Sequence, residues 1–204
     1  MSIRRYDPNR RDRIIDACLA VIAEIGVDGA SHRKIAEAAD VPLGSMTYHF
    51  TGMHELLREA FTRFTVTVSD QFEARMATAA SRGQAKEAVV QTVVGDLFST
   101  QRDLVLTHEL YTLAARDPEF RKITNAWMGR SRRILEQHFD PATAQILDAL
   151  IEGLAIHRAL DIVPQDDALV RDAIDRITSR QNTPDRNTSD RNTPDRNAAG
   201  VSAP

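Results

Sequence analysis

The chain has 204 residues and a mean hydropathy of −0.35, with 42% hydrophobic and 27% charged residues. This balance is typical of a globular protein and excludes both a chain too polar to fold and one that spans a membrane. The net charge of −3 argues against a protein that coats nucleic acid through a general positive field, and the single cysteine excludes an internal disulfide. The first residues lack the apolar segment of a secretory signal, so we expect a cytoplasmic protein.

The spacing of apolar residues predicts an all-helical fold. Apolar residues recur every three or four positions, and aromatic residues make up only 5% of the chain. Asp117-Pro118 and Asp140-Pro141 are typical helix starts, because Asp caps free N–H groups and Pro needs no donor at the first helical position. Helices are predicted over residues 10–25, 32–39, 43–49, 53–80, 84–99, 102–116, 118–138, 141–160 and 165–179.

The first fifteen residues form a basic arm, with five arginines, Arg11 among them, against two aspartates. Such an arm is as often a solvated tail as a binding element, so the segment that follows decides its meaning. Cys18 lies among apolar residues of the first predicted helix, which predicts a buried small side chain and not a reactive thiol.

Residues 31–50 have the pattern of a helix-turn-helix, in which two short helices cross at a tight turn. Ser31 is a favourable N-cap, and Asp40 stands in the turn, where Asp tolerates a positive φ better than most residues. Val41 precedes Pro42 and is therefore disfavoured in the helical region, which ends the first helix. Buried contacts between the two helices are expected from Ile35, Ala36, Ala39, Val41, Met46 and Phe50.

The second short helix offers a surface without acidic residues, as a DNA-recognition helix requires. Its outer face is expected to carry Leu43, Gly44, Ser45, Thr47, Tyr48 and His49. Gly44 costs helix stability but lets a phosphate or base edge approach the backbone, and the polar side chains can form hydrogen bonds with DNA. The alternative is that Leu43 and Met46 are core residues and the polar side chains are merely solvated.

Two segments in this region, SHRKIA at residues 31–36 and DVPLGSMTYHF at residues 40–50, resemble the DNA-binding signature of the TetR/AcrR-type bacterial transcription regulators. The resemblance is specific over about residues 13–61. It implies a three-helix DNA-binding domain, a long fourth helix as connector, a helical ligand-binding domain and a homodimer formed by the last two long helices. Ser31, His32 and Arg33 then join Arg11 and the outer face of the second short helix as expected DNA-contacting residues.

The sequence departs from the family pattern at several positions. Asp40 replaces the usual turn Gly, Pro42 replaces a Ser or Thr cap, and Thr47 stands where a phosphate-contacting Tyr is common. Thr51 and Met53 stand where Lys is common. Tyr48, His49 and the arginines of the arm are therefore the expected phosphate partners, and fewer cations predict a weaker salt dependence of DNA binding.

The fourth predicted helix has a continuous apolar stripe, although residues 64–68 alternate like a strand. The stripe consists of Leu57, Phe61, Phe64, Val68, Phe72 and Met76. If the resemblance holds, the helices from about 84 to 138 enclose a cavity for a small, largely apolar ligand. Candidate lining residues are Phe64, Phe98, Leu104, Tyr111 and Trp127, with His108, Glu109 and Arg130 as polar anchors; for each of them alone, a core or surface position is the favoured alternative.

The last two predicted helices are compatible with the dimer that the family implies, since the first of them is apolar on more than one side and Gly153 permits close approach. The expected interface consists of Leu147, Leu150, Ile151, Leu154, Leu169, Ala173, Ile174 and Ile177. After them, a five-residue motif occurs three times between residues 182 and 196 without an apolar side chain, which predicts a disordered tail.

Three units are therefore expected: a DNA-binding domain at 1–52, an effector-binding and dimerisation domain at 53–180, and a tail at 181–204. An enzyme is not expected, because the sequence contains no nucleophile with a paired base, no phosphate-binding loop and no zinc-protease motif, and neither a cofactor nor a metal site is expected. The predicted function is a homodimeric, ligand-released repressor that binds a palindromic operator in double-stranded DNA. A helical adaptor that binds only protein, with a degenerate DNA-binding module, is the second hypothesis.

Overall fold

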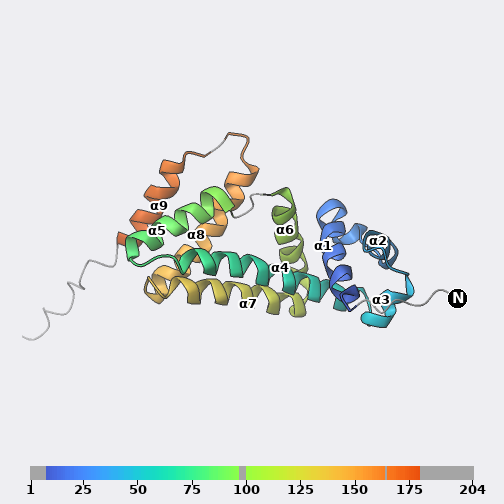
Figure 1. The fold of residues 1–204 in the computed structure, drawn as a ribbon. Coiled ribbons are helices and arrows are strands. Elements are labelled where there is room, and N and C mark those ends of the chain that lie inside the picture. Colours follow the sequence, from blue (N-terminus) through green and yellow to red (C-terminus); the bar gives the residue numbers. More distant parts are fainter. Residues whose placement is uncertain (1–7, 97–99, 164, 180–204) are drawn as a thin grey trace, which may run out of the picture.

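The computed structural model describes residues 8–96, 100–163 and 165–179, and these are all helix, turn or loop (Figure 1). The prediction of an all-helical fold is confirmed. In chain order the elements are α1 (Arg10–Gly29), α2 (His32–Ala38), α3 (Gly44–His49), α4 (Met53–Met76), α5 (Arg82–Gln91), the π-helical turn η1 (Thr92–Asp96), α6 (Gln101–Arg116), α7 (Pro118–Leu135), α8 (Pro141–Leu160) and α9 (Asp167–Ser179). No helix of the described segments is long and apolar enough to cross a membrane.

The helices fall into two packed groups at opposite ends of an elongated molecule (Figure 1). One hydrophobic core joins α1, α2 and α3 to the first half of α4, to α6 and to the first half of α7, and its Ile14, Ile35, Met46 and Phe61 are fully buried. The other joins α5, α8 and α9 to the end of α7. Helices α4 and α7 lie side by side along the length of the molecule and connect the two groups.

The predicted helix starts at Asp117 and Asp140 are confirmed. The Asp117 carboxylate accepts a hydrogen bond from the Glu119 N–H at 2.8 Å, and the Asp140 carboxylate accepts one from the Thr143 N–H at 3.0 Å. The apolar stripe of the fourth predicted helix is also confirmed, because α4 is one continuous helix whose Leu57, Phe61, Phe64 and Met76 are buried.

Some helix ends differ from the prediction. The α4 helix ends at Met76 and α7 ends at Leu135, three to four residues before the predicted ends. The fifth predicted helix leaves α-helical geometry at Thr92, where three β-branched residues followed by Gly95 weaken the helix. Its predicted end at residue 99, the arm before residue 8 and the repeat at 182–196 lie outside the described residues.

Candidate DNA-binding and ligand-binding sites

The turn between α2 and α3 has the geometry that the sequence predicts. Asp40 has a φ of 50°, in the left-handed region, and the Val41 N–H donates to the Ala36 carbonyl at 2.9 Å. The Arg13 guanidinium of α1 donates to the carbonyls of Ala39 at 3.0 Å and Asp40 at 3.1 Å. The turn is therefore held from outside by α1, in addition to its own backbone bonds.

Helix α3 presents Tyr48 as its most exposed large side chain, at 83% exposure, with Leu43 at 55% just before the helix. The Tyr48 and His49 rings meet edge to face at 4.9 Å between centroids. Thr47 is also exposed, although its hydroxyl donates to the Gly44 carbonyl at 3.3 Å. These residues form a mostly neutral surface that can lie against a nucleic-acid groove.

Two expectations for this helix need correction. Ser45 is buried at 8% exposure, beside the fully buried Met46, so it belongs to the inner face of α3 and not to the outer one. The sequence pattern placed it outside because a serine reads as polar, whereas its short side chain fits between the helices. The alternative that Leu43 is a core residue is wrong, because more than half of its surface is exposed.

The other predicted DNA-contacting residues differ in their exposure and in their contacts within the protein. Arg11 pairs with Glu59 of α4, and its guanidinium lies 5.1 Å from the centre of the Phe50 ring. Ser31 caps α2 by accepting a hydrogen bond from the Lys34 N–H at 3.3 Å. Arg33 is exposed and forms no ion pair with any described residue, and His32 is half-buried.

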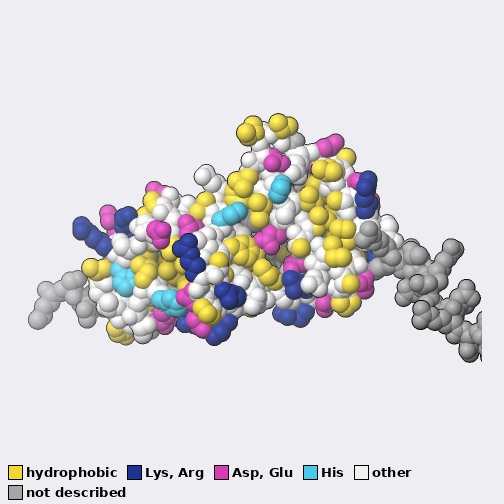
Figure 2. All heavy atoms as spheres, turned by 180° about the vertical axis from the view of Figure 1, so that it is seen from behind, with side chains coloured by type: hydrophobic (Ala, Val, Ile, Leu, Met, Phe, Trp, Pro, Cys, Tyr) yellow, Lys and Arg dark blue, Asp and Glu magenta, His cyan; other side chains and the backbone are white. Residues whose placement is uncertain are grey.

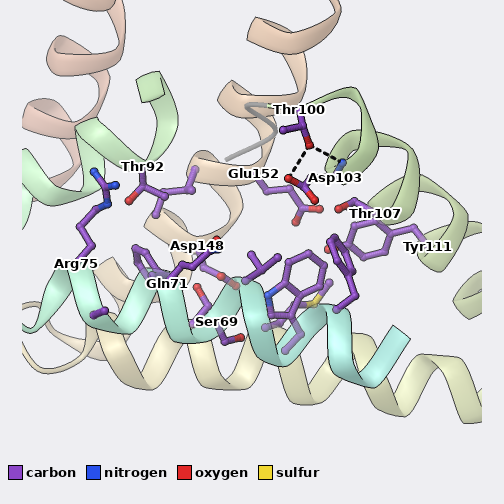
Figure 3. Close-up of a pocket in the computed structure, with 18 of the residues that line it drawn as sticks. Ser69, Gln71, Arg75, Thr92, Thr100, Asp103, Thr107, Tyr111, Asp148 and Glu152 are labelled. Atoms are coloured by element: carbon purple, nitrogen blue, oxygen red, sulfur yellow. Dashed lines mark hydrogen bonds between the residues drawn. The ribbon is translucent and has the colours of Figure 1, made fainter. Parts of the chain in front are cut away.

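A cavity of about 790 Å³ lies between α4, α6, α7 and α8 (Figure 3). Its aromatic wall contains Tyr111 and Trp127, whose rings are nearly parallel with centroids 6.3 Å apart, and Phe64, which meets Trp127 edge to face. Figure 2 shows the opposite face of the molecule, with a hollow near its middle that contains acidic side chains. The volume is sufficient for a drug-sized molecule.

Three carboxylates line the cavity, and they differ in their neutralisation. Asp148 pairs with Arg132 at 2.9 Å, and Asp103 accepts a hydrogen bond from the Thr100 hydroxyl at 2.8 Å and pairs with Arg102 at 3.3 Å. Glu152 has no lysine or arginine partner among the described residues. Burial raises the pKa of Glu152, against the opposing effect of a hydrogen bond from the Tyr111 hydroxyl. The nearby Asp148 carboxylate raises the pKa further, and the nearby His108 lowers it.

The sequence prediction for the cavity is right for its aromatic residues and wrong for its polar ones. Phe64, Tyr111 and Trp127 line the cavity, whereas Leu104 and the predicted anchors do not, and Phe98 lies outside the described residues. The three anchors, His108, Glu109 and Arg130, are occupied elsewhere: His108 bonds to the Leu104 carbonyl at 2.8 Å, Glu109 lies against Gly26 of α1, and Arg130 pairs with Asp70 at 2.6 Å and with Glu73.

The cavity carboxylates of α8 were missed, although the sequence contains a signal for them. Asp148 and Glu152 are four residues apart, so they project from the same face of the helix, within a stretch over residues 146–156 that carries no other polar side chain. An acidic pair in that position requires a polar environment inside the fold. The cavity is accordingly more acidic than a ligand that is largely apolar would need.

Cys18 is fully buried, and burial raises the pKa of its thiol to about 12, as expected for a structural side chain. The described residues contain no group of three His, Cys, Asp or Glu side chains that could hold a metal ion.

The predicted dimer interface divides into buried and accessible residues. Leu147, Ile151 and Ile174 belong to the hydrophobic core that joins α5, α8 and α9, with at most 6% exposure, so their assignment to an interface is wrong. Leu169 is 54% exposed, and Leu150, Leu154, Ala173 and Ile177 are half-buried. Other exposed apolar residues of α8 and of the loop after it are Ile146, Leu160, Ile162 and Val163. Figure 2 shows hydrophobic side chains gathered over this end of the molecule.

Comparison with known families matches both parts of the chain. Residues 14–60 match the family described as bacterial regulatory proteins, tetR family, and residues 80–180 match the tetracyclin repressor-like C-terminal domain. Among curated proteins, the HTH-type transcriptional regulator PksA of Bacillus subtilis is 28% identical over 169 residues, which cover 76% of this chain and 80% of PksA.

Solved structures give the same result. The proposed transcriptional regulator SCO7518 from Streptomyces coelicolor A3(2) is 57% identical, with a TM-score of 0.80, over 84% of this chain and 99% of that one. The multidrug binding protein EbrR in complex with ethidium is 32% identical, with a TM-score of 0.68, over 84% of this chain and 99% of its own.

Proposed function

Because this chain belongs to the TetR family of DNA-binding transcriptional regulators, we propose that it is a homodimeric repressor, released from a palindromic operator by an aromatic organic cation. It is a regulator and not an enzyme. We propose that it acts in the cytoplasm. The observation that carries the proposal is the combination of an exposed, mostly neutral α3 surface at one end with an acidic, aromatic cavity near the middle.

The DNA-binding part of the proposal rests on α3. Tyr48 reaches farthest into solvent, His49 supports its ring, and Arg33 offers an exposed cation at the start of α2. We assign Tyr48 and Arg33 to phosphate contacts, and Leu43, Thr47 and His49 to the rest of the DNA-facing surface, with Gly44 allowing close backbone approach. Arg11 and Ser31 act mainly by holding α1 and α2 in place for this surface.

A dimer would place two such surfaces in successive major grooves, roughly 34 Å apart. The exposed apolar residues of α8 and α9 and the loop between them support an interface of two copies related by a two-fold axis, because a monomer rarely leaves such a continuous patch in water. The operator is then a palindrome or close to one.

The test is selection of the purified protein against a pool of random double-stranded DNA at near-physiological salt. We expect a palindromic sequence to be enriched, and Tyr48→Ala to lose it while its unfolding midpoint stays unchanged, because the side chain is 83% exposed. Val66→Ala, a truncation at a position of α4 that is 46% exposed and lies outside the α3 surface, is the control. Failure to enrich any sequence would contradict the repressor and support the adaptor hypothesis.

The ligand class is proposed from the cavity. A planar cation can stack on Tyr111 and Trp127 and place its charge near Glu152, the carboxylate that no lysine or arginine neutralises among the described residues. The similarity to EbrR, described as a multidrug binding protein in complex with ethidium, proflavin and malachite green, agrees with this class.

Release from DNA requires the cavity to be coupled to the DNA-binding end, and α6 connects the two. Asp103, Thr107 and Tyr111 of α6 line the cavity, while Leu106 and Leu110 are buried in the core shared with α1. We propose that a bound ligand favours a position of α6 and α4 in which the two α3 helices of the dimer no longer match the half-site spacing.

Ethidium titration tests the ligand class, with the fluorescence of the single tryptophan, Trp127, as the reporter of cavity binding. We expect ethidium to quench Trp127 and to release the selected operator, and Glu152→Gln to weaken binding at least tenfold. Asp172→Asn, which removes an exposed carboxylate from α9, should bind as the wild type does. Quenching without operator release would contradict the coupling but not the ligand class.

A further inference from the structure

Thr107 carries a buried hydroxyl that has no partner. Its side chain on α6 is fully buried, it lines the cavity, and its Oγ1 forms no hydrogen bond with any described residue. The other buried threonines satisfy their hydroxyls. Those of Thr65, Thr92, Thr124 and Thr178 each donate to a backbone carbonyl three or four residues earlier, at 2.8–3.0 Å.

Thr107 lies on the same wall of the cavity as Glu152, the carboxylate without a lysine or arginine partner among the described residues. Figure 3 shows Asp103, Thr107 and Tyr111 of α6 on the same side of the cavity as Glu152 of α8, with Arg75 at the far end. Asp103 is occupied by Thr100 and Arg102. On this wall the Glu152 carboxylate, which accepts a hydrogen bond from the Tyr111 hydroxyl, keeps further lone pairs for a ligand, and the Thr107 hydroxyl has no partner among the described residues.

Such a wall is complementary to a cation that donates hydrogen bonds. A protonated amine or an amino-substituted aromatic cation offers N–H groups to both oxygens and at the same time supplies the positive charge. A cation whose nitrogens are fully alkylated supplies the charge alone and forgoes the hydrogen bond to the Thr107 hydroxyl, so it gains less on binding.

We propose that Thr107 is a specificity-determining residue that, together with Glu152, selects N–H-bearing organic cations over N-alkylated cations of the same framework. This inference rests on the proposed function, since it refines the class of ligand that the cavity takes. Glu152 recognises the charge and accepts one N–H group, and the Thr107 hydroxyl adds the second acceptor, on which most of the discrimination between donor and non-donor nitrogens rests.

The test compares two fluorescent xanthylium dyes of the same charge. Rhodamine 123 has N–H groups on both amino nitrogens, and its tetramethyl derivative, tetramethylrhodamine methyl ester, has none. Binding to the full-length protein is followed by fluorescence anisotropy. We expect the wild type to prefer rhodamine 123 by at least tenfold, Thr107→Val to reduce that preference to about threefold or less, and Thr107→Ser to retain it.

The valine variant also reports on folding. Since the Thr107 hydroxyl has no partner in the ligand-free protein, Thr107→Val should unfold at the same temperature as the wild type or higher. Thr124→Val, which removes a hydroxyl that donates to the Arg121 carbonyl at 3.0 Å, should unfold at a lower temperature. A lower midpoint for Thr107→Val would show that the hydroxyl is satisfied and would overturn the inference.

The outcomes separate this inference from the proposed function. The same ratio of affinities for the two dyes in the wild type and in Thr107→Val would contradict the role of Thr107. If both dyes still released the operator, the proposed cation-responsive repressor would stand. Binding of the neutral dye Nile red in place of both cations, or of none of the three dyes, would contradict the proposed ligand class and the inference with it.

Discussion

At the scale of single residues, burial of the Glu152 carboxyl opposes folding when it is ionised, whereas the same carboxylate favours binding of a cationic ligand. Its carboxyl is buried enough for its pKa to rise, and the Tyr111 hydroxyl compensates only part of the loss of water. A carboxyl that is easier to protonate in the folded state than in the unfolded state stabilises the fold at low pH and loses that contribution as pH rises. A bound cation would oppose the preference of the Glu152 carboxyl for its protonated form, because the cation favours the ionised carboxylate.

Ligand affinity should therefore depend on pH in a range above the usual pKa of a glutamate. As pH falls through the raised pKa of Glu152, the carboxyl becomes neutral and ethidium should bind more weakly, whereas affinity should level off at higher pH. Titrations of Trp127 fluorescence between pH 5 and 8 measure this. Glu152→Gln should give a flat profile, and a slope that persists in that variant would assign the effect to another group.

A second residue, Asp40, is notable for its backbone conformation. Its φ of 50° is unfavourable for most side chains, and Asp is among the few non-glycine residues that adopt it at modest cost. The surrounding bonds from Arg13 keep the turn in this state.

Substitutions at position 40 should show whether Asp40 stabilises the turn through its backbone conformation or through its carboxylate. Asp40→Ala is expected to lower the free energy of unfolding by about 1 kcal/mol, because alanine tolerates the left-handed region poorly. Asp40→Gly is expected to stay within about 0.5 kcal/mol of the wild type, since glycine adopts this region readily. Urea denaturation measures both, and equal losses in the two variants would point to the carboxylate.

At the scale of elements, the end of α1 is shaped by its contact with α6. Gly26 has φ 72° and ψ 171°, a conformation essentially restricted to glycine, and a Cβ atom there would lie 2.7 Å from Oε1 of Glu109. The DNA-binding end therefore touches the same helix that lines the cavity, and a side chain at position 26 would displace the end of the Glu109 side chain.

Gly26→Ala should destabilise the protein by about 1–3 kcal/mol, because the substitution strains the backbone and crowds Glu109. Gly83→Ala is the matched control: position 83 lies in α5, and a Cβ atom there would meet only the Ser81 Oγ at 3.9 Å, an ordinary van der Waals distance, so this change should be neutral or stabilise by about 0.4–1 kcal/mol. Thermal unfolding compares the two. Adding Glu109→Ala to Gly26→Ala should recover only the part that is due to crowding.

Local signals in the sequence predict most of the elements but not the site inside them. Caps, Asp-Pro pairs and the α4 stripe lie within one helix or its ends, so they can be found without knowing the fold. The hydrogen-bonding wall of the cavity depends on Thr107 and Glu152 meeting across two helices that are far apart in sequence. Ser45 was misplaced for a related reason, since a short helix can rotate one residue either way without a clear change in its pattern.

At the scale of the whole molecule, α8, α9 and the loop between them expose apolar side chains that the single chain leaves uncovered. Ile146, Leu160 and Leu169 are each at least half exposed, and the loop residues Ile162 and Val163 project even farther. The neighbouring Leu147, Ile151 and Ile174 already fill the chain's own core. The two helices thus have an inner apolar face for this chain and an outer one for the proposed partner.

Charge on the outer face should separate the proposed dimer without unfolding the monomer. Leu169→Glu is expected to shift the protein from dimer to monomer in sedimentation experiments at micromolar concentration and to abolish operator binding. Val66→Glu introduces the same charge at an exposed position of α4, at 46% exposure compared with 54%, and should remain dimeric. A wild-type protein that sediments as a monomer would contradict the proposed interface directly.

The double use of α6 has a consequence for anyone who would convert this protein into a biosensor for a new compound. Substitutions in the α7 and α8 walls change which compound enters the cavity, whereas substitutions in α6 also alter a helix that packs on α1. Libraries built on the α7 and α8 positions should yield variants with new specificity and an unchanged response range. Libraries built on α6 should instead be rich in variants that bind their compound without releasing the operator, or that release the operator without the compound.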